Sequence, residues 1–408
     1  MKKLISILIA AAMVLSLAAC GGAPAASSGG SSAGSSAAST SEGASSEATT
    51  NTESKGVIGY NYFATGDYAL DTLANNTKHV IEACGYEAMG VCDNGSLDQL
   101  VTDVENMIAS GVDGLILWIP NDSLYLTVAG MCEEAGVPFC LADKVPTDTA
   151  ITEQLEQYEY YVGGVTPDNY SYGVQMGEFA LDQGWTTCFI LASGVGDASG
   201  TPRIDGFTAT FEAGGGKILG TQHTDDSNQA VTQAEDMYLA NPDADFIMAT
   251  GASTFGTAAL ETLQKYNDQN MKIVTADFDE TILASMKESD TVAFLIGDFL
   301  VCGSYAAVLM CNYLNGTPIT DEDGSAPYID VVPAFSIPVE EQDLFSKYIA
   351  GDCIYSDEEC QEMMGLTLDE FVNDWILKFD SLESRLQAKY EQGIISADEM
   401  EAAGLTVE

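Results

Sequence analysis

Apolar runs and amphipathic segments alternate along the chain from residue 57 onwards. Short apolar runs such as 57–63 and 113–119 are typical of buried strands. Segments such as 71–84 place apolar residues three or four positions apart, as one face of a helix requires. Glycine follows several of these segments, in the position where a left-handed residue ends a helix. The alternation predicts parallel sheets with helices on both faces.

The alternation occurs in two successive series. In the first series we expect strands at 57–63, 87–92, 113–119 and 138–142, with helices at 71–84, 97–110 and 123–135. In the second series we expect strands at 160–163, 186–192, 217–221, 244–249 and 272–275, with helices at 169–183, 202–213, 230–240 and 254–266. The predicted fold class is therefore α/β, with two doubly wound parallel-sheet lobes.

The last part of the chain has a helical pattern without strands. Residues 367–370 form a capping box, and they begin a stretch with apolar residues three or four positions apart up to residue 386. This spacing predicts one long amphipathic helix, and residues 396–399 begin a shorter one. We expect a helical C-terminal extension over 343–408. It either packs on the lobes or offers a contact surface to a membrane partner or a second copy.

The N-terminal segment resembles a lipoprotein signal peptide. Two lysines precede an apolar stretch over 4–17, and small residues lead directly to Cys20. We expect residues 1–20 to be the signal peptide and Cys20 to be acylated; an ordinary secretory signal is the alternative. Residues 21–55 lack large apolar side chains and are expected to form a disordered tether. The protein is thus expected outside the cytoplasm, anchored to the membrane by lipid.

Composition excludes several classes of function. The chain has 408 residues, and 62 Asp and Glu against 14 Lys and Arg give a net charge of −48. This balance argues against nucleic acid as a partner, because phosphate binding needs a basic surface. Two arginines and two histidines leave no basis for a histidine triad or an HExxH zinc site. We expect no cofactor and no metal.

Nine cysteines follow Cys20. Most of them lie in apolar runs, where a small buried side chain is the simplest interpretation. Cys353 and Cys360 lie in a polar, acidic segment instead. They either form a disulfide or remain thiols.

Polar and aromatic residues follow the predicted strands, where ligands bind in open α/β sheets. Carboxylates, amides, one arginine and aromatic rings together suit a neutral polyhydroxylated ligand. The candidates from the strand ends are Phe63, Asp67, Tyr68, Asp93, Trp118, Asp143, Lys144, Asn169, Arg203, Thr250 and Asp277.

Arg203 is the most informative single candidate, because it is the only arginine in the two predicted lobes. Its planar fork of donors suits bidentate recognition of hydroxyls or a carboxylate, and a structural salt bridge is the alternative. Asp143 and Asp277 each follow a buried strand, as ligand-binding carboxylates or as helix N-caps. Trp118 is either a core residue or an aromatic platform in the cleft.

Several motifs together resemble the sugar-binding type I periplasmic binding proteins of ABC transporters. The resemblance runs from about Val57 to Gly316, and the segments that carry it are Gln99, 105–108, 111–116, 135–138, 203–207, 241–245 and 274–277. It implies two lobes joined by a three-strand hinge, with the ligand between them. The implied crossings lie near 161–163, 297–298 and 327–329. The N-terminal lobe would comprise 56–162 with 299–327, and the C-terminal lobe 163–298 with 328–342.

The same resemblance implies roles for individual residues. Phe63, Asp67 and Tyr68 match the polar and aromatic ligand contacts after the first strand. Asp143 with Lys144, Arg203 and Asp277 match later ligand positions. Asp298, at the second crossing, joins the candidates beside Gly297, where the family has Gln. The sequence departs from the family at 250–252 and at 69–70, which leaves the identity of the ligand open.

We therefore expect a non-enzymatic extracytoplasmic lipoprotein that captures a small polar ligand, a monosaccharide above all, by hinge closure. Its expected partner is an ABC permease, to which it delivers the ligand. One alternative is a ligand sensor that signals to a membrane receptor kinase, which the C-terminal extension suggests. A binder of a non-sugar ligand such as a nucleoside is another, and a carbohydrate-cleaving enzyme is the third.

Overall fold

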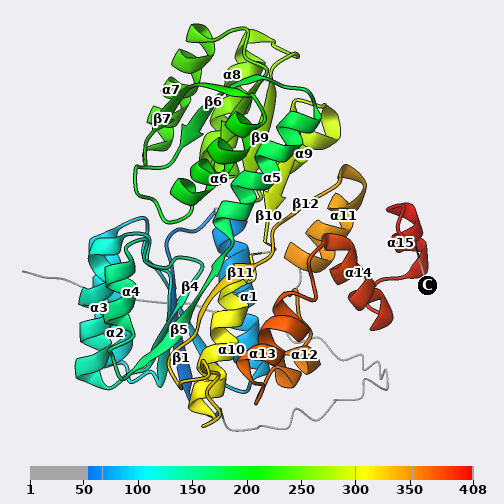
Figure 1. The fold of residues 1–408 in the computed structure, drawn as a ribbon. Coiled ribbons are helices and arrows are strands. Elements are labelled where there is room, and N and C mark those ends of the chain that lie inside the picture. The colour runs from blue at the N-terminus through cyan, green and yellow to red at the C-terminus, as the bar shows by residue number, and fades with distance from the viewer. Residues whose placement is uncertain (1–53, 67, 299, 351–352, 407–408) are drawn as a thin grey trace, which may run out of the picture. The chain divides into compact units, whose positions relative to one another are not determined.

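A computed structural model of the chain describes residues 54–66, 68–298, 300–350 and 353–406 (Figure 1). The predicted signal peptide, the acylation of Cys20 and nearly all of the predicted tether lie outside these residues. Asp67 also lies outside them. None of the helices in the described part is long and apolar enough to cross a membrane.

The first lobe is built on a six-stranded parallel sheet with the order β11-β5-β4-β3-β1-β2. Its strands are β1 (Val57–Tyr62), β2 (Glu87–Cys92), β3 (Gly114–Leu117), β4 (Phe139–Ala142), β5 (Tyr161–Pro167) and β11 (Tyr328–Val332). Its helices are α1 (Tyr68–Ala83), α2 (Leu97–Ala109), α3 (Asp122–Ala135), α4 (Thr149–Leu155) and α10 (Cys302–Leu314). Side chains of β3 alternate between two cores: Leu115 packs with α2 and α3, and Ile116 packs with α1 and α10.

The second lobe repeats this plan, with the strand order β12-β10-β9-β8-β6-β7. Its strands are β6 (Thr187–Ala192), β7 (Lys217–His223), β8 (Phe246–Ala249), β9 (Lys272–Ala276), β10 (Val292–Gly297) and β12 (Phe335–Ser336). Only the short β12 pairs antiparallel within this sheet of the described chain. Its helices are α5 (Asn169–Asp182), α6 (Gly200–Ala213), α7 (Ser227–Ala240), α8 (Thr257–Tyr266) and α9 (Glu280–Glu288), with a π-helical turn η1 (Ala252–Gly256) before α8. The predicted pair of doubly wound lobes is confirmed.

The chain crosses between the sheets three times, and two crossings lie a few residues further along than expected. Strand β5 continues in the first sheet as far as Pro167 instead of leaving it near 163. All seven of its residues are buried, so pairing continues until the chain turns into α5 at the N-cap Asp168. Strand β11 also pairs with β5, so residues 328–332 belong to the first lobe. The crossing at 297–298 lies where we expected it.

The C-terminal extension is helical, as predicted. It contains η2 (Val339–Glu341), α11 (Gln342–Phe345), η3 (Ser346–Ala350), α12 (Asp357–Glu362), α13 (Leu368–Phe371), η4 (Val372–Ile376), α14 (Leu382–Glu391) and α15 (Ala397–Ala402). The single long helix predicted over 368–386 is wrong, because the chain leaves the helix after Ile376 and starts α14 at Leu382, with Ser381 as its N-cap. The Ser381 side chain accepts a hydrogen bond from the Ser384 backbone and thereby caps the new helix. The apolar side chains share one buried face despite this break.

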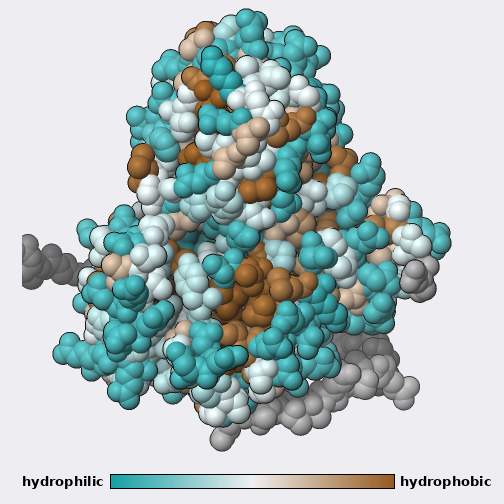
Figure 2. Space-filling model, in the orientation of Figure 1, coloured by the Kyte–Doolittle hydropathy of each residue, from teal (hydrophilic) through white to brown (hydrophobic). Residues whose placement is uncertain are grey.

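Most of the surface on the face drawn in Figure 2 is hydrophilic. Hydrophobic residues gather where Figure 1 places β11 and α10.

Cys360, one of the two cysteines considered for a disulfide, is a buried free thiol, so it does not pair with Cys353.

The second arginine of the chain, Arg385, holds the extension together. Its side chain is fully buried, and Nη1 and Nη2 each donate to a different carboxylate oxygen of Glu359 at 2.7 Å. Nε donates to the Ile354 carbonyl at 2.7 Å, and the guanidinium lies 4.7 Å from the Tyr355 and Phe379 ring centres. A buried ion pair of this geometry joins α12 to α14, which the local sequence pattern does not connect.

Replacing Arg385 by Ala is expected to destabilise the folded chain by about 3–5 kcal/mol, because the Glu359 carboxylate would stay buried without its cation. Urea unfolding followed by circular dichroism should show a clearly lower transition midpoint. Lys347→Ala is the control, since Lys347 pairs with Glu399 in the same extension but at its surface. Equal midpoints for the two variants would contradict this role of Arg385.

Candidate ligand-binding site

A cavity of about 270 Å³ lies at the carboxyl ends of the strands of both lobes. Seven of the predicted residues line it: Trp118, Asp143, Lys144, Arg203, Thr250, Asp277 and Asp298. They come from loops after β3, β4, β8, β9 and β10 and from the start of α6. A larger cavity of about 530 Å³ beside β5 and β11 contains Asn169 but none of these seven residues. The smaller cavity is therefore the candidate site.

The other described candidates lie around this cavity. Asn169 accepts a hydrogen bond from Arg203 Nε at 2.9 Å, and the Phe63 ring lies 5.3 Å from the Trp118 ring. Asp93 is fully buried and accepts a hydrogen bond from Asn61. Tyr68 lines a different cavity, with residues of α9 and the extension. Helix α1 begins at Tyr68, and its inward turn towards the main cavity presents Leu70 and Leu73 instead.

Asp143 and Asp277 occupy equivalent places in the two lobes. Each directly follows a central strand and has a left-handed backbone, with φ of 67° and 64°. Few residues other than glycine adopt this conformation, and Asp is among those that tolerate it. The helix N-caps nearby are Asp148 and Asp279, so neither Asp143 nor Asp277 caps a helix. Their carboxylates line the cavity instead.

Arg203 is buried, and most of its N–H groups donate hydrogen bonds to other groups of the protein. Its Nη1 and Nη2 donate to the two oxygens of Asp277 at 2.7 and 2.9 Å. Nη1 also donates to the Thr250 carbonyl at 2.7 Å, and the Tyr172 ring lies 4.6 Å from the guanidinium. Burial acts to lower the pKa of Arg203, but the Asp277 carboxylate outweighs it and raises this pKa. With Nε bonded to Asn169, one of the five N–H groups is left for a ligand.

The close packing of α5 and α6 fixes the start of the Arg203 side chain. A Cβ atom at Gly173 of α5 would lie 2.0 Å from the Arg203 carbonyl oxygen. Gly206 of α6 approaches α5 in the same way, with the Tyr170 carbonyl oxygen 2.2 Å from a Cβ at that position. Side chains at these two glycines would push the helices apart and move the guanidinium.

Lys144 connects the two lobes across the cavity. Its Nζ donates to Ser199 Oγ at 2.5 Å and lies 4.0 Å from an Asp197 oxygen. Burial acts to raise the pKa of Asp197, but Lys144 and the backbone N–H of Gly200 together bring it below its usual value. Asp197 and Ser199 were not among the candidates. Both lie in the loop between β6 and α6, and this position after a strand was the only signal for them.

Trp118 is both a core residue and a wall of the cavity. Only 8% of its surface is exposed, and its indole Nε1 donates to Asp143 Oδ2 at 2.8 Å. Asn61 fixes its backbone: Oδ1 accepts from the Trp118 N–H at 2.8 Å and Nδ2 donates to the Trp118 carbonyl at 2.9 Å. Asn61 Nδ2 also donates to Asp93. Asp93 therefore helps to hold Asn61, and through it Trp118, without lining the cavity itself.

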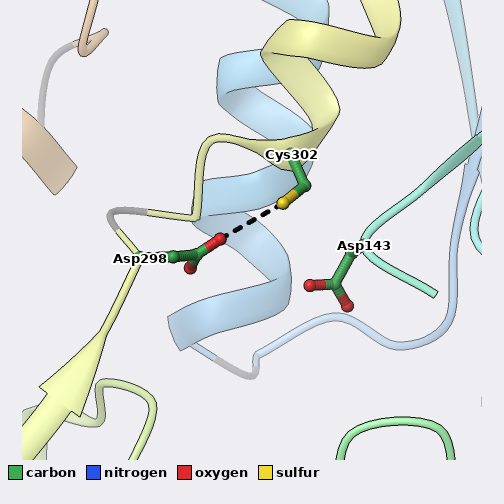
Figure 3. Close-up of side chains that lie close together, drawn as sticks. All are labelled: Asp143, Asp298 and Cys302. Atoms are coloured by element: carbon green, nitrogen blue, oxygen red, sulfur yellow. Dashed lines mark hydrogen bonds between the residues drawn. The ribbon is translucent and has the colours of Figure 1, made fainter. Parts of the chain in front are cut away.

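Asp143, Asp298 and Cys302 lie close together beside the second crossing (Figure 3). One oxygen or sulfur atom from each lies within 4.8 Å of the others. The Asp298 oxygens accept hydrogen bonds from the Leu300 N–H at 3.0 Å and from Cys302 Sγ at 3.3 Å. The spacing would admit a cation, but a thiol and carboxylates prefer different metals, and these oxygens already have donors. The cluster better fits a ligand that donates hydrogen bonds.

Burial controls the charge of this cluster. It raises the pKa of Asp298 to about 7, with a further contribution from the negative charge of Asp143. Burial raises the pKa of Asp143 as well, although Lys144 and the Trp118 N–H oppose this. Hydroxyl groups of a ligand would stabilise both carboxyl groups, because they would replace the hydrogen bonds to water that burial removes.

The apolar wall of the cavity was missed by sequence reasoning. It includes Leu70 and Leu73 of α1 and Phe255 of η1. Apolar residues on helices indicate a core, and nothing in the local pattern distinguishes a cavity wall from one. The polar Ser253 and Thr254 lie in η1, just after the end of β8, and could have been found from the strand-end position.

The chain folds into two similar lobes, and residues of both lobes line the cavity at their strand ends. Residues 53–318 match the family model described as the periplasmic binding protein domain, and the chain belongs to this family. Its members are non-enzymatic solute-binding proteins, and membership implies an extracytoplasmic location. No curated protein matches the chain.

Solved structures of sugar-binding proteins share the fold. A galactofuranose-binding protein is 15% identical, with a TM-score of 0.59, over 72% of this chain and 99% of its own. A solute-binding protein of Bacillus halodurans with bound myo-inositol is 16% identical, with a TM-score of 0.60, over 73% and 100%. The arabinose-transporter component of Shewanella sp. ANA-3 is 16% identical, with a TM-score of 0.59, over 71% and 95%. More than a quarter of this chain thus has no counterpart in them.

Asp298 is expected to make the stability of the protein depend on pH. Its pKa is about 7 in the folded protein and near 3.8 when unperturbed. Between these values the folded protein holds a proton that the unfolded chain has lost. Its contribution to the free energy of unfolding therefore falls as the pH rises from about 4 to about 7. Asp298→Asn should reduce the drop in urea midpoint between about pH 5 and about pH 8.

The control for this measurement is Asp369→Asn, at an exposed position of the extension. Burial also raises the pKa of Asp93 to about 7, so Asp298→Asn should remove only part of the pH dependence. An unchanged difference between the two pH values in Asp298→Asn would contradict the assignment.

Proposed function

We propose that the protein is a membrane-anchored lipoprotein that captures a small polar ligand, a monosaccharide in the first place, and delivers it to an ABC permease. The observation that carries this proposal is the cavity shared by two polar sets. Arg203 and Asp277 face it from one lobe, and Asp143 and Lys144 face it from the other. Its volume of about 270 Å³ suits one sugar ring better than a larger solute.

The chemistry of the walls supports a ligand rich in hydroxyl groups. The carboxylates of Asp143, Asp277 and Asp298 are acceptors for hydroxyl donors, and the remaining N–H of Arg203 can donate to a ring or hydroxyl oxygen. Trp118 and Phe255 offer apolar surface to the C–H groups of a sugar. The alternation of polar and apolar wall is typical of sites that orient a small ligand.

Capture would work by a shift between open and closed lobes. A ligand that touches both polar sets gains its full contacts only when the lobes are closed, so binding favours the closed form. The permease would then recognise that form. Signalling to a receptor kinase would use the same closure with another partner, so the two alternatives share this ligand site.

The anchor rests on the first part of the sequence. The apolar stretch 4–17 followed by small residues and Cys20 supports acylation at Cys20. The Gly, Ser and Ala composition of 21–55 supports a flexible connection of the lobes to a membrane surface.

A thermal-shift screen tests the ligand class. The full chain would be heated with pentoses, hexoses, inositols, nucleosides and amino acids in turn. A ligand at 100 times its dissociation constant adds about 2.7 kcal/mol of stability, enough to raise the melting temperature visibly. A hit among sugars or inositols is the expected result. A hit among nucleosides or amino acids alone would overturn the monosaccharide and keep the two-lobe mechanism.

Arg203→Ala is expected to weaken binding of the best sugar hit by about 2–4 kcal/mol, because it removes a donor and leaves Asp277 without its partner. Isothermal titration calorimetry measures this loss directly. Lys265→Ala, which removes an exposed pair with Glu235 in the same lobe, should leave the dissociation constant unchanged. Equal affinities for wild type and Arg203→Ala would remove Arg203 from the site.

A further inference from the structure

The C-terminal extension contacts the second lobe next to the ligand site. Phe345 of α11 packs on Phe278, with ring centres 4.7 Å apart and both side chains fully buried. Asp343 forms an ion pair with Lys287 of α9. Phe278 directly follows Asp277, the carboxylate that holds Arg203.

The same extension is bonded to the first lobe by buried polar contacts. The hydroxyl groups of Tyr355 and Tyr305 of α10 lie 2.6 Å apart. Asn312 of α10 donates to the Met363 carbonyl at 3.1 Å and accepts from the Gly365 N–H at 2.6 Å. The extension therefore cannot leave the first lobe without breaking several buried hydrogen bonds.

A third contact reaches the second crossing between the lobes. Asn76 of α1 donates to the Leu300 carbonyl at 3.3 Å and accepts from the Ile354 N–H of the extension at 3.4 Å. Leu300 has a φ of 58°, and its N–H donates to Asp298 at 3.0 Å. Asn76 thus links the extension to the loop that presents Asp298 to the cavity.

Both points of contact lie beside backbone in a sparsely populated conformation. Asp277 and Leu300 have left-handed φ values without being glycine. Such backbone conformations are unfavourable for residues other than glycine, and they persist where their surroundings hold them. Phe345 packs on Phe278, the residue after Asp277. Asn76 donates to the Leu300 carbonyl and is itself bonded to the Ile354 N–H.

We propose that the C-terminal extension, as described over residues 339–350 and 353–406, is a brace of the hinge. It ties the two lobes together and holds the two turns that present Asp277 and Asp298 to the ligand cavity. Phe345 and Asn76 are positioning residues, because they act on the site through Phe278 and Leu300.

The brace sets how far the cleft opens. In this structure the lobes also meet across the cavity, where Lys144 donates to Ser199. The contact of Phe345 with Phe278 exists in the same arrangement, so it stabilises that arrangement relative to a more open one. The first lobe, the second lobe and the extension meet around one further cavity. It is lined by Tyr68 of the first lobe, Lys287 of the second and Ser346 of the extension.

The test uses the full chain without ligand, so it is independent of the proposed sugar. Trp118 lines the cleft and reports its opening once Trp185 and Trp375 are replaced by Phe. In this background, Phe345→Ala should increase acrylamide quenching of Trp118 by about threefold or more, as the open form gains population. Small-angle X-ray scattering should show a larger radius of gyration for the same variant.

Two controls separate the brace from simple destabilisation. Lys347→Ala changes the exposed surface of the same extension and should alter neither readout. Phe345→Leu keeps an apolar contact and should restore most of the wild-type quenching. Unchanged quenching and an unchanged radius of gyration in folded Phe345→Ala would overturn the proposal.

If Phe345→Ala does not fold, Lys287→Ala and Asn76→Ser decide the question. Lys287→Ala loosens the ion pair to α11, and Asn76→Ser removes the link between Ile354 and Leu300. Each should raise Trp118 quenching by a smaller amount. No increase in either folded variant would overturn the brace, whatever ligand the screen identifies.

Discussion

The bidentate ion pair between Arg203 and Asp277 is the interaction on which the ligand site depends. Arg203 is only 4% exposed, and its guanidinium needs a carboxylate beside it because an unpaired buried charge would be strongly unfavourable. Asn169, Thr250 and the Tyr172 ring complete its surroundings. The chain has 62 acidic residues and only two arginines, and it uses both in the same way. Arg385 is likewise buried, bonded to a carboxylate and placed over a tyrosine ring.

This use of Arg203 determines what the cavity can offer a ligand. Lys144, the other cation in its wall, is held between Ser199 and Asp197. Asp143 and Asp298 are left with neutral donors, and burial raises their pKa values. A ligand whose hydroxyl groups donate to these carboxylates would replace the water they have lost. An anionic ligand would instead meet two acids whose ionisation is already unfavourable, so the electrostatics of the cavity favour neutral polyols over anions.

The sequence could predict what depends on local pattern and on position along a strand. The alternation of strands and helices predicts both lobes, and the strand-end rule selects Asp143, Arg203 and Asp277, which line the candidate cavity. It could not choose Asp277 among the many acids as the partner of Arg203, because the two lie 74 residues apart. It placed Tyr68 and Asp93 in the site by position alone, whereas one lines another cavity and the other supports Trp118 from beneath. The periodicity over 368–386 showed which side chains of the extension are buried. It did not show that the helix is interrupted before Ser381, because the apolar side chains on both sides of the interruption belong to the same core.

Helix α10 shows why the extension is part of the structure rather than an addition to it. Every residue from Cys302 to Asn312 is buried, on all sides of the helix. One side packs on the first sheet and another on α1, but these two elements leave part of the helix surface uncovered. Contacts with Tyr355, Met363 and Gly365 cover the side that would otherwise face water. The matching family domain ends at residue 318, just after this helix, so the apolar sequence of α10 already requires a partner from beyond the domain. The extension that supplies this cover also reaches Leu300, through Ile354 and Asn76, and Phe278, through Phe345. The segment that covers one helix thereby also supports the ligand site.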